Sequence, residues 1–524
     1  MVVQASRSRR AVPLLIGLLV ALAVAAPLGI RALSAADPVL SGVDEGATVT
    51  TDAVRALGVS APEGHDLDEV QVLLDGKPAQ TRRDGDRLLL ADPVLPDGEH
   101  SVSARVPARM MPDREATLTF TVDGTAPELA VEPVAVSDPR KPFTLKGKAI
   151  GATALTADDQ PVPLADDGAF SVQFPKAPAR VQLSARDDAG NSAKQEYAVP
   201  VRHPGMKAVH MTAMAWTSDA LREPVLRMAR EGRINTIQLD IKDESGEVGY
   251  QSQVPLAREI GATRGHYDAK AVVDQLHREG IRVVGRLVAF RDPILAKASW
   301  AAGKTDRVIQ TADGKPWSGG YGDFAFTNFA NPEVVAYNTD LATEAADIGF
   351  DDVLYDYIRR PEGALAQMKI PGLQGTPEQS ITAFLAKSRD AVRDRGAFLG
   401  ASVFGIAASR PGPVAQDIPM MAQHVDYLAP MVYPSHWGPG EYGVAQPESQ
   451  PYDITARSVA EFVAKSKDSG TQVIPWLQAF SLRKSYGPAE VQAQIQASKD
   501  NGASSFLLWN ASCRYESAGL PPAP

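Results

Sequence analysis

The stretch "GFDDVLYDYIRRP", residues 349–361, joins a helix end, a strand and a polar strand end in one short segment. Gly349 follows a helical segment, and glycine can end a helix in the left-handed conformation without a Cβ penalty. The apolar run after it predicts a buried strand. A carboxylate in such a strand is costly to desolvate, so we expect Asp356 to have a function.

The same order of elements recurs through residues 203–524. Six helical segments end in a glycine just before the next strand, at Gly232, Gly280, Gly349, Gly396, Gly470 and Gly502. The candidate strands are "KAVHMTAM", "NTIQLDIK", "RVVGRLVAF", "DDVLYDYI", "FLGASVFG", "VDYLAPMVY", "QVIPWLQAF" and "SSFLLWN". Eight strands that alternate with helices over this length predict a (β/α)8 TIM barrel. A doubly wound open sheet is the competing fold, but no Gly-x-Gly-x-x-Gly opens the first helix.

Two all-β modules are predicted before the barrel, over residues 37–127 and 128–202. Short alternating runs such as "VQVLLDGKPAQTRR" and "FTLKGKA" are separated by Asp-Gly turns, which is a hairpin signal. We interpret them as two immunoglobulin-like sandwiches in tandem. Aspartate clusters such as "RDDAGN" fit turns and also fit calcium ligands.

The N-terminus, residues 1–36, has the pattern of an export signal. Three arginines precede the apolar run 11–30, and the small residues of "RALSAAD" suit a cleavage site. The run is also long enough to span a bilayer, so a cleaved signal peptide and a retained membrane anchor both stay open. In either case we expect residues 38–524 to be extracytoplasmic, secreted or anchored.

Composition excludes several classes of protein. The formal net charge is −10, which argues against a nucleic-acid partner, since no basic stripe is present. Cys513 is the only cysteine, so the chain has neither an intramolecular disulfide nor a cysteine-based metal site. No His, Asp or Glu cluster has metal-ligand spacing, so we expect neither a metal nor a cofactor.

Strand periodicity sorts the polar residues of the barrel. On the second strand Gln238, Asp240 and Lys242 share one face, which we expect to point into the barrel mouth. The third strand places Arg286 on that side, and Asp292 follows in the loop. The fourth strand places Asp356 there. Active sites of such barrels lie at these carboxyl ends.

Later strand ends add aromatic and amide groups. The expected mouth residues are Tyr433, His436, Trp437, Trp476, Gln478, Trp509 and Asn510. Flat aromatic faces beside hydrogen-bonding groups suit a sugar ring, and paired carboxylates suit glycosidic cleavage. Structural interpretations stay open: ion pairs could explain the charged residues, His436 could cap a loop, and the tryptophans could belong to the core.

The motifs "LDIKDESGEVGYQS", "GRLVAFRD", "GFDDVLYDYIRRPEG", "PMVYPSHW", "PWLQAF" and "LLWN" follow one another over residues 207–510. In this order they resemble a family of bacterial glycoside hydrolases that was first catalogued as a domain of unknown function. The resemblance implies a TIM barrel and a carbohydrate-active role. It maps shared polar positions onto Asp240, Lys242, Asp243, Arg286, Asp292, Asp356, Arg359, Tyr433, His436, Trp476 and Gln478.

The predicted function is therefore an exported glycoside hydrolase acting on a cell-surface or extracellular polysaccharide or oligosaccharide. Asp356 is the expected nucleophile or base, with Asp240 as preferred partner and Asp292 next. Asp243 is a further candidate for the acid. Arg286, Lys242 and Arg359 would keep the carboxylates ionised or contact substrate.

One residue departs from the family pattern. Ser402 stands in "GASVFG", where an acid often ends the fifth strand in that family, so the second carboxylate is open. The rival hypothesis is a non-catalytic glycan-binding protein with a degenerate barrel. A purely structural surface protein is the third class, but it leaves the polar strand ends unexplained.

Overall fold

The computed structural model describes residues 36–107 and 112–521, in two compact units that meet between Thr125 and Ala126. The predicted boundary between residues 202 and 203 lies inside the second unit. The predicted leader, 1–36, lies outside the described residues except for its last position. Among the residues described, no helix combines the length and apolar character needed to cross a membrane.

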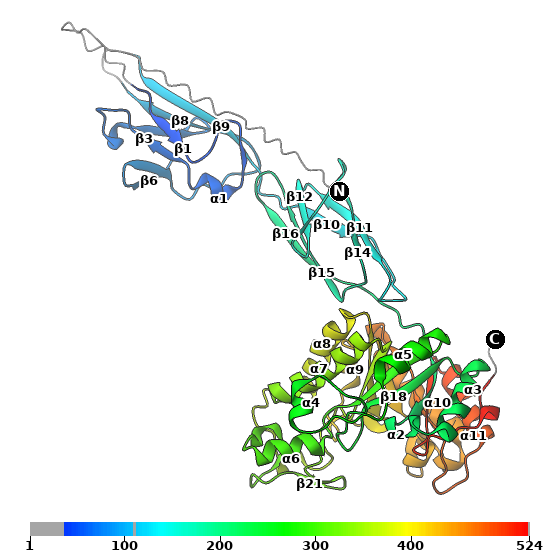
Figure 1. Cartoon of the computed structure of the whole chain (residues 1–524). Coiled ribbons are helices and arrows are strands. Elements are labelled where there is room, and N and C mark those ends of the chain that lie inside the picture. The colour runs from blue at the N-terminus through cyan, green and yellow to red at the C-terminus, as the bar shows by residue number, and fades with distance from the viewer. Residues whose placement is uncertain (1–35, 108–111, 522–524) are drawn as a thin grey trace, which may run out of the picture. The chain divides into compact units, whose positions relative to one another are not determined.

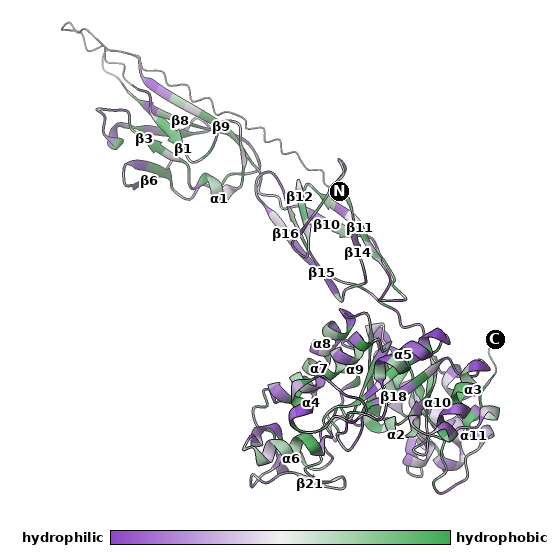
Figure 2. Cartoon of the chain, viewed as in Figure 1, coloured by the Kyte–Doolittle hydropathy of each residue, from purple (hydrophilic) through white to green (hydrophobic). Residues whose placement is uncertain are grey.

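The first unit is built from two sheets that share one core. One sheet has the order β1 (Val39–Ser41), β3 (Gly58–Ser60), β7 (Arg87–Leu90), β6 (Thr81–Asp84). The other has the order β2 (Thr48–Val49), β9 (Arg114–Val122), β8 (Gly98–Val106), β4 (Gln71–Leu74), β5 (Lys77–Pro78). Val59 and Leu90 from the first sheet pack with Val102 and Phe120 from the second. Buried and exposed residues alternate along β9, visible as hydropathy bands in Figure 2.

A second pair of sheets opens the second unit. The orders are β10 (Glu128–Val131), β11 (Phe143–Ile150), β14 (Ala169–Phe174) and β13 (Gln160–Val162), β12 (Ala154–Ala157), β15 (Arg180–Arg186), β16 (Ser192–Ala198). Leu145 and Leu183 lie in their shared core. Where the structure describes residues 37–202 they form mainly sheets, together with the one-turn helix α1 (Thr51–Val54). The immunoglobulin-like topology and the domain limits stay predictions.

The rest of the chain forms a closed barrel of parallel strands (Figure 1). Around the barrel they are β17 (Lys207–Met211), β18 (Thr236–Lys242), β19 (Arg282–Val288), β23 (Asp352–Asp356), β25 (Phe398–Phe404), β26 (Tyr427–Met431), the pair β27 (Gln472–Val473) and β28 (Trp476–Gln478), and β29 (Phe506–Trp509). Pairing of β29 with β17 and of β25 with β26 closes the ring. The barrel prediction is confirmed, and the open sheet is excluded.

Helices surround the barrel. The main ones are α3 (Asp219–Arg230), α5 (Ala269–Arg278), α6 (Pro293–Ala301), α7 (Pro332–Ile348), α8 (Pro377–Arg393), α10 (Pro451–Ser466) and α11 (Pro488–Asp500). Gly349 ends α7 with φ 122°, and the other five predicted glycines also have positive φ. Leu239 and Leu287 pack on the helix side of the sheet, while Val284 and Leu354 lie in the barrel interior.

Candidate active site

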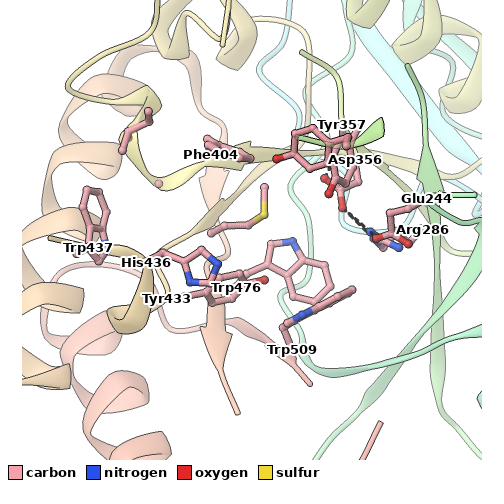
Figure 3. A pocket seen from close by; sticks show the side chains of 14 residues that line it. Glu244, Arg286, Asp356, Tyr357, Phe404, Tyr433, His436, Trp437, Trp476 and Trp509 are labelled. Carbon is pink, nitrogen blue, oxygen red and sulfur yellow. Dashed lines mark hydrogen bonds and ion pairs between the residues drawn. The ribbon is translucent and has the colours of Figure 1, made fainter. Parts of the chain in front are cut away.

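A cavity of about 520 Å³ opens at the carboxyl ends of the barrel strands (Figure 3). Its lining comes from six strands and the segments that follow them, from Glu244 in the loop after β18, and from Tyr321 in the segment between α6 and α7. The lining residues are Glu244, Arg286, Tyr321, Asp356, Tyr357, Phe404, Gly405, Ile406, Met431, Tyr433, His436, Trp437, Trp476 and Trp509. Seven of these were predicted: Arg286, Asp356, Tyr433, His436, Trp437, Trp476 and Trp509.

Asp356 is the last residue of β23, and both of its carboxylate oxygens are bound. Its Oδ1 accepts a hydrogen bond from the Tyr357 N–H at 2.7 Å. Its Oδ2 accepts two from Arg286, from Nε at 2.9 Å and from Nη2 at 2.7 Å. Tyr357 has φ 49°, a left-handed conformation that costs energy for a bulky residue and is typical of functional sites. The strained turn and Arg286 together fix the direction of the carboxylate.

Glu244 is the second carboxylate of the cavity, and the sequence analysis missed it. It binds the same Arg286 Nη2 as Asp356 (Figure 3). Burial alone would raise the pKa of Glu244, but the Arg286 charge and hydrogen bond outweigh it and lower that pKa to about 2. Glu244 is therefore ionised in the free site.

The loop that carries Glu244 is shaped by its neighbours. Oδ1 of Asp243 accepts hydrogen bonds from the N–H groups of Ser245 at 2.9 Å and Glu247 at 3.1 Å, which forms a tight turn. Asp243 does not line the cavity. Its predicted site role is therefore replaced by a structural one, which is to present Glu244.

The prediction that Lys242 points into the barrel mouth is wrong. The register of β18 against β19 shifts between Asp240 and Lys242, so Lys242 pairs with Leu287 on the helix side. Its ammonium group is fully buried and donates to Asp292 at 2.7 Å and to Asn338 of α7 at 3.0 Å. A bulge moves the side chain to the other face of the sheet.

Asp292, a predicted catalytic acid, also lies outside the cavity. It caps α6 by accepting from the Leu295 N–H at 2.9 Å, and its other oxygen binds Lys242. Gly246 of the Glu244 loop packs so closely on Asp292 that an added Cβ would lie 2.3 Å from its Oδ1. The buried Lys242–Asp292 pair therefore supports the loop and does not line the cavity.

Asp240 lies beneath the cavity and does not line it. Its Oδ1 accepts hydrogen bonds from His210 Nε2 at 3.0 Å and from Arg286 Nη1 at 3.1 Å. Burial would lower the pKa of His210, but the charge and hydrogen bond of Asp240 raise it to about 9. The buried charges thus alternate in sign from His210 to Asp240 to Arg286. Arg286 in turn binds the two cavity carboxylates, Asp356 and Glu244.

Aromatic rings form the other walls of the cavity (Figure 3). The rings of Trp476 and Trp509 meet edge to face at 5.6 Å, and Arg286 lies 5.0 Å from the Trp509 ring centroid. Ser402 accepts a hydrogen bond from Trp476 Nε1 at 3.0 Å, so the residue that replaces the expected acid orients a wall tryptophan. Burial and the nearby Arg483 lower the pKa of His436, which is therefore neutral at pH 7.

Three other predicted contacts lie behind the walls. Arg359 donates to the Tyr321 hydroxyl at 2.9 Å and packs under Phe404, 4.4 Å from its ring centroid. Gln478 accepts from the Ser435 N–H at 3.0 Å and so holds the His436 loop. Asn510, just after β29, donates to the backbone carbonyls of Ala479 and Arg514. None of the three lines the cavity.

No group of three or more His, Cys, Asp or Glu side chains placed to hold a metal ion occurs within residues 36–107 and 112–521.

Residues 208–515, more than half of the chain, match the model of a family described as "Putative glycosyl hydrolase domain". The chain belongs to this family. The resemblance inferred from the motifs is thereby confirmed, and so is the predicted class of enzyme, a glycosidase with a carbohydrate substrate. None of the curated proteins matches the chain in sequence.

Several solved structures are similar to this glycosyl hydrolase family member. A hypothetical protein from Ruminiclostridium thermocellum ATCC 27405 is 31% identical over 37% of this chain and 96% of its own, with a TM-score of 0.33. The PgaB (BpsB) glycoside hydrolase domain from Bordetella bronchiseptica is 16% identical over 59% and 95%, with a TM-score of 0.44. The endo-1,4-beta-D-mannanase from Thermotoga petrophila RKU-1 is 12% identical over 58% and 88%, with a TM-score of 0.40.

Proposed function

We propose that the chain is an exported glycoside hydrolase that cleaves a cell-surface or extracellular polysaccharide by double displacement, with Asp356 and Glu244 as its two carboxylates. One observation carries the proposal: both carboxylates bind a single guanidinium nitrogen, Arg286 Nη2, inside an aromatic cavity. Two carboxylates at the scissile bond are what glycosidic cleavage needs. The charged N-terminal leader supports export.

Asp356 is the proposed nucleophile. Its side chain is 7% exposed and bound at both oxygens, so it is presented in one orientation. An oxygen of Asp356 attacks the anomeric carbon, the glycosidic bond breaks, and a glycosyl ester forms. Water then attacks the ester and releases Asp356 together with the sugar.

Glu244 is the proposed acid and base. Its side chain is 31% exposed and lies on a loop, so it can move more than Asp356 can. It gives a proton to the leaving oxygen in the first step and takes one from water in the second. Because Arg286 keeps Glu244 ionised in the free site, the entering substrate must separate the two before Glu244 can take up its proton.

The spacing supports retention of anomeric configuration. Two oxygens that accept hydrogen bonds from one nitrogen lie within roughly 6 Å of each other. Retaining enzymes hold their carboxyl groups about 5–5.5 Å apart, whereas inverting enzymes need about 6.5–9.5 Å.

The cavity walls supply the binding surface. Trp476, Trp509 and Tyr433 offer flat apolar faces for the C–H side of a sugar ring. The cavity volume of about 520 Å³ falls in the range of small-molecule sites, ~300–1,000 Å³. The two β modules before the barrel are proposed to be immunoglobulin-like.

A glycan-binding barrel without catalysis is the second candidate. The observation in its favour is that Arg286 engages both carboxylates, and the low pKa of Glu244 leaves the free site without a protonated carboxylic acid at this position.

Release of reducing ends separates the two functions. The protein is incubated with soluble mannan, galactan, xylan, dextran and glycol chitin, and the initial product is followed by proton NMR. We expect reducing ends from at least one polysaccharide, with the anomeric configuration of the product retained. Asp356→Asn, purified in the same way, controls for a contaminating glycosidase. Binding without release from any of the five would contradict the hydrolase and favour the glycan-binding protein.

A further inference from the structure

A second hollow of about 460 Å³ lies next to the catalytic cavity, on the segment 302–331 between α6 and α7. This segment carries a small hairpin, β21 (Ser318–Gly319) and β22 (Gly322–Asp323). Trp317, Phe326 and Pro361 contribute apolar surface to the hollow, and Glu362 contributes a carboxylate.

Tyr321 lines both hollows, so the two are neighbours that share this one side chain. Its position is fixed on several sides. Arg359 donates to its hydroxyl at 2.9 Å, and Arg291 lies 4.8 Å from its ring centroid. Its ring also meets the edge of Tyr357, the neighbour of Asp356, at 6.0 Å. Tyr321 is therefore a firmly held side chain that borders both the second hollow and the part of the catalytic cavity near Asp356.

The chemistry of the second hollow matches that of a sugar site. Trp317 is half-buried and provides an aromatic face. A Cβ placed on Gly320 or Gly322 would meet no heavy atom within 4 Å, so the space beside these two residues is open to a ligand. Glu362 is 42% exposed in its side chain and pairs with Arg359 at 3.2 Å, so it can accept from hydroxyl groups without adding an uncompensated charge.

We infer that this second hollow binds further sugar units of the chain that is cut at Asp356. The inference rests on the proposed function and deepens it: the substrate is an oligosaccharide or polysaccharide several units long, and Trp317 stacks on a unit remote from the scissile bond. A glycosidase that removed single terminal sugars would not need a second aromatic hollow next to the first.

The inference is tested by affinity electrophoresis, in which a protein that binds the polysaccharide in the gel migrates more slowly. The protein carries Asp356→Asn, so that cleavage cannot interfere. The gels contain mannan, galactan, xylan, dextran or glycol chitin. We expect at least one polysaccharide to retard this protein. Adding Trp317→Ala should weaken the retardation on the order of 10-fold, as the loss of one stacked ring predicts. Trp317→Phe should restore most of it, because the flat ring returns.

Tyr452→Ala is the matched control. Tyr452 is an exposed aromatic residue of α10 that lines neither hollow, so the control should migrate like the parent. Equal retardation of the parent and the Trp317→Ala protein, or no retardation in any gel, would overturn the inference. Retardation that depends on Trp317, without release of reducing ends by the unsubstituted protein, would overturn the hydrolase proposal and leave the second sugar site standing.

Discussion

Replacing Glu244 by Gln is expected to lower kcat/KM on a polysaccharide by roughly 10²–10⁴-fold, the usual contribution of a general acid. The sugar alkoxide that leaves needs a proton, and the amide cannot supply one. A 2,4-dinitrophenyl glycoside has a leaving group that needs no proton. The first step on that substrate should therefore be slowed by only about tenfold or less.

Pre-steady-state release of dinitrophenol measures this first step directly. In the second step the amide cannot take a proton from water, so the glycosyl ester should accumulate and give a burst. Added azide should remove the accumulated ester, because azide attacks the anomeric carbon without help from a general base. Glu247→Gln is the matched control, because Glu247 lies in the same loop but pairs with Arg264 and does not line the cavity. Equal losses on both substrates would mean that Glu244 does not donate the proton.

Replacing Arg286 by Met is expected to lower the free energy of unfolding at pH 7 by about 3–5 kcal/mol, the cost of removing one partner from a buried ion pair. Arg286 is 1% exposed and contacts Asp240, Asp356 and Glu244. Without it, three carboxylates share a site, and only Asp240 among them keeps its bond to the His210 ring. Urea unfolding measures the change.

The pH dependence of this deficit identifies its cause. Arg286 lowers the pKa of Glu244 from its ordinary 4.5 to about 2, so that contribution to stability is present above pH 4.5 and is lost as pH falls toward 2. The deficit of Arg286→Met should therefore shrink over that window. Arg264→Met, which removes a partly exposed ion pair, should cost at most about 1 kcal/mol. A deficit independent of pH would assign the loss to packing of the Arg286 side chain.

The barrel could be predicted because its signals are local and repeated. Each strand is a short apolar run, and a glycine with positive φ follows each of six helices before the next strand. The seventh strand shows a limit of such patterns: it was predicted as one run, but it is split into β27 and β28 around Ile474 and Pro475. Proline cannot donate to the ladder, so a break at this point has a physical cause.

The candidate site was only half predictable, because alternation fails at an irregularity of the sheet. Alternation placed Arg286 and Asp356 correctly. After Asp240 the register of β18 shifts, which sends Lys242 to the helices and returns Glu244 to the cavity. A signal for Glu244 was present in the motif "LDIKDESGE", where an acid follows the strand and a serine-glycine turn follows the acid.

How deep a side chain lies along the barrel axis also could not be predicted from the sequence. Period-2 geometry tells which side of the sheet a residue faces, not how far it lies from the opening. Asp240 does lie inside the barrel, yet it does not line the cavity, and its partner His210 was not predicted as a site residue. Pairing of β17 with β18 places His210 opposite Gln238. This register between two strands cannot be read from the residue pattern of either strand alone.

Covalent trapping tests the central claim most directly. The unsubstituted protein is incubated with 2,4-dinitrophenyl 2-deoxy-2-fluoro glycosides of glucose, galactose and mannose, digested with a protease and analysed by tandem mass spectrometry. We predict a stable fluoroglycosyl ester on Asp356, with Glu244 unlabelled. A label on another residue would contradict the assignment of Asp356 as nucleophile, and so would turnover of these substrates with inversion and no adduct.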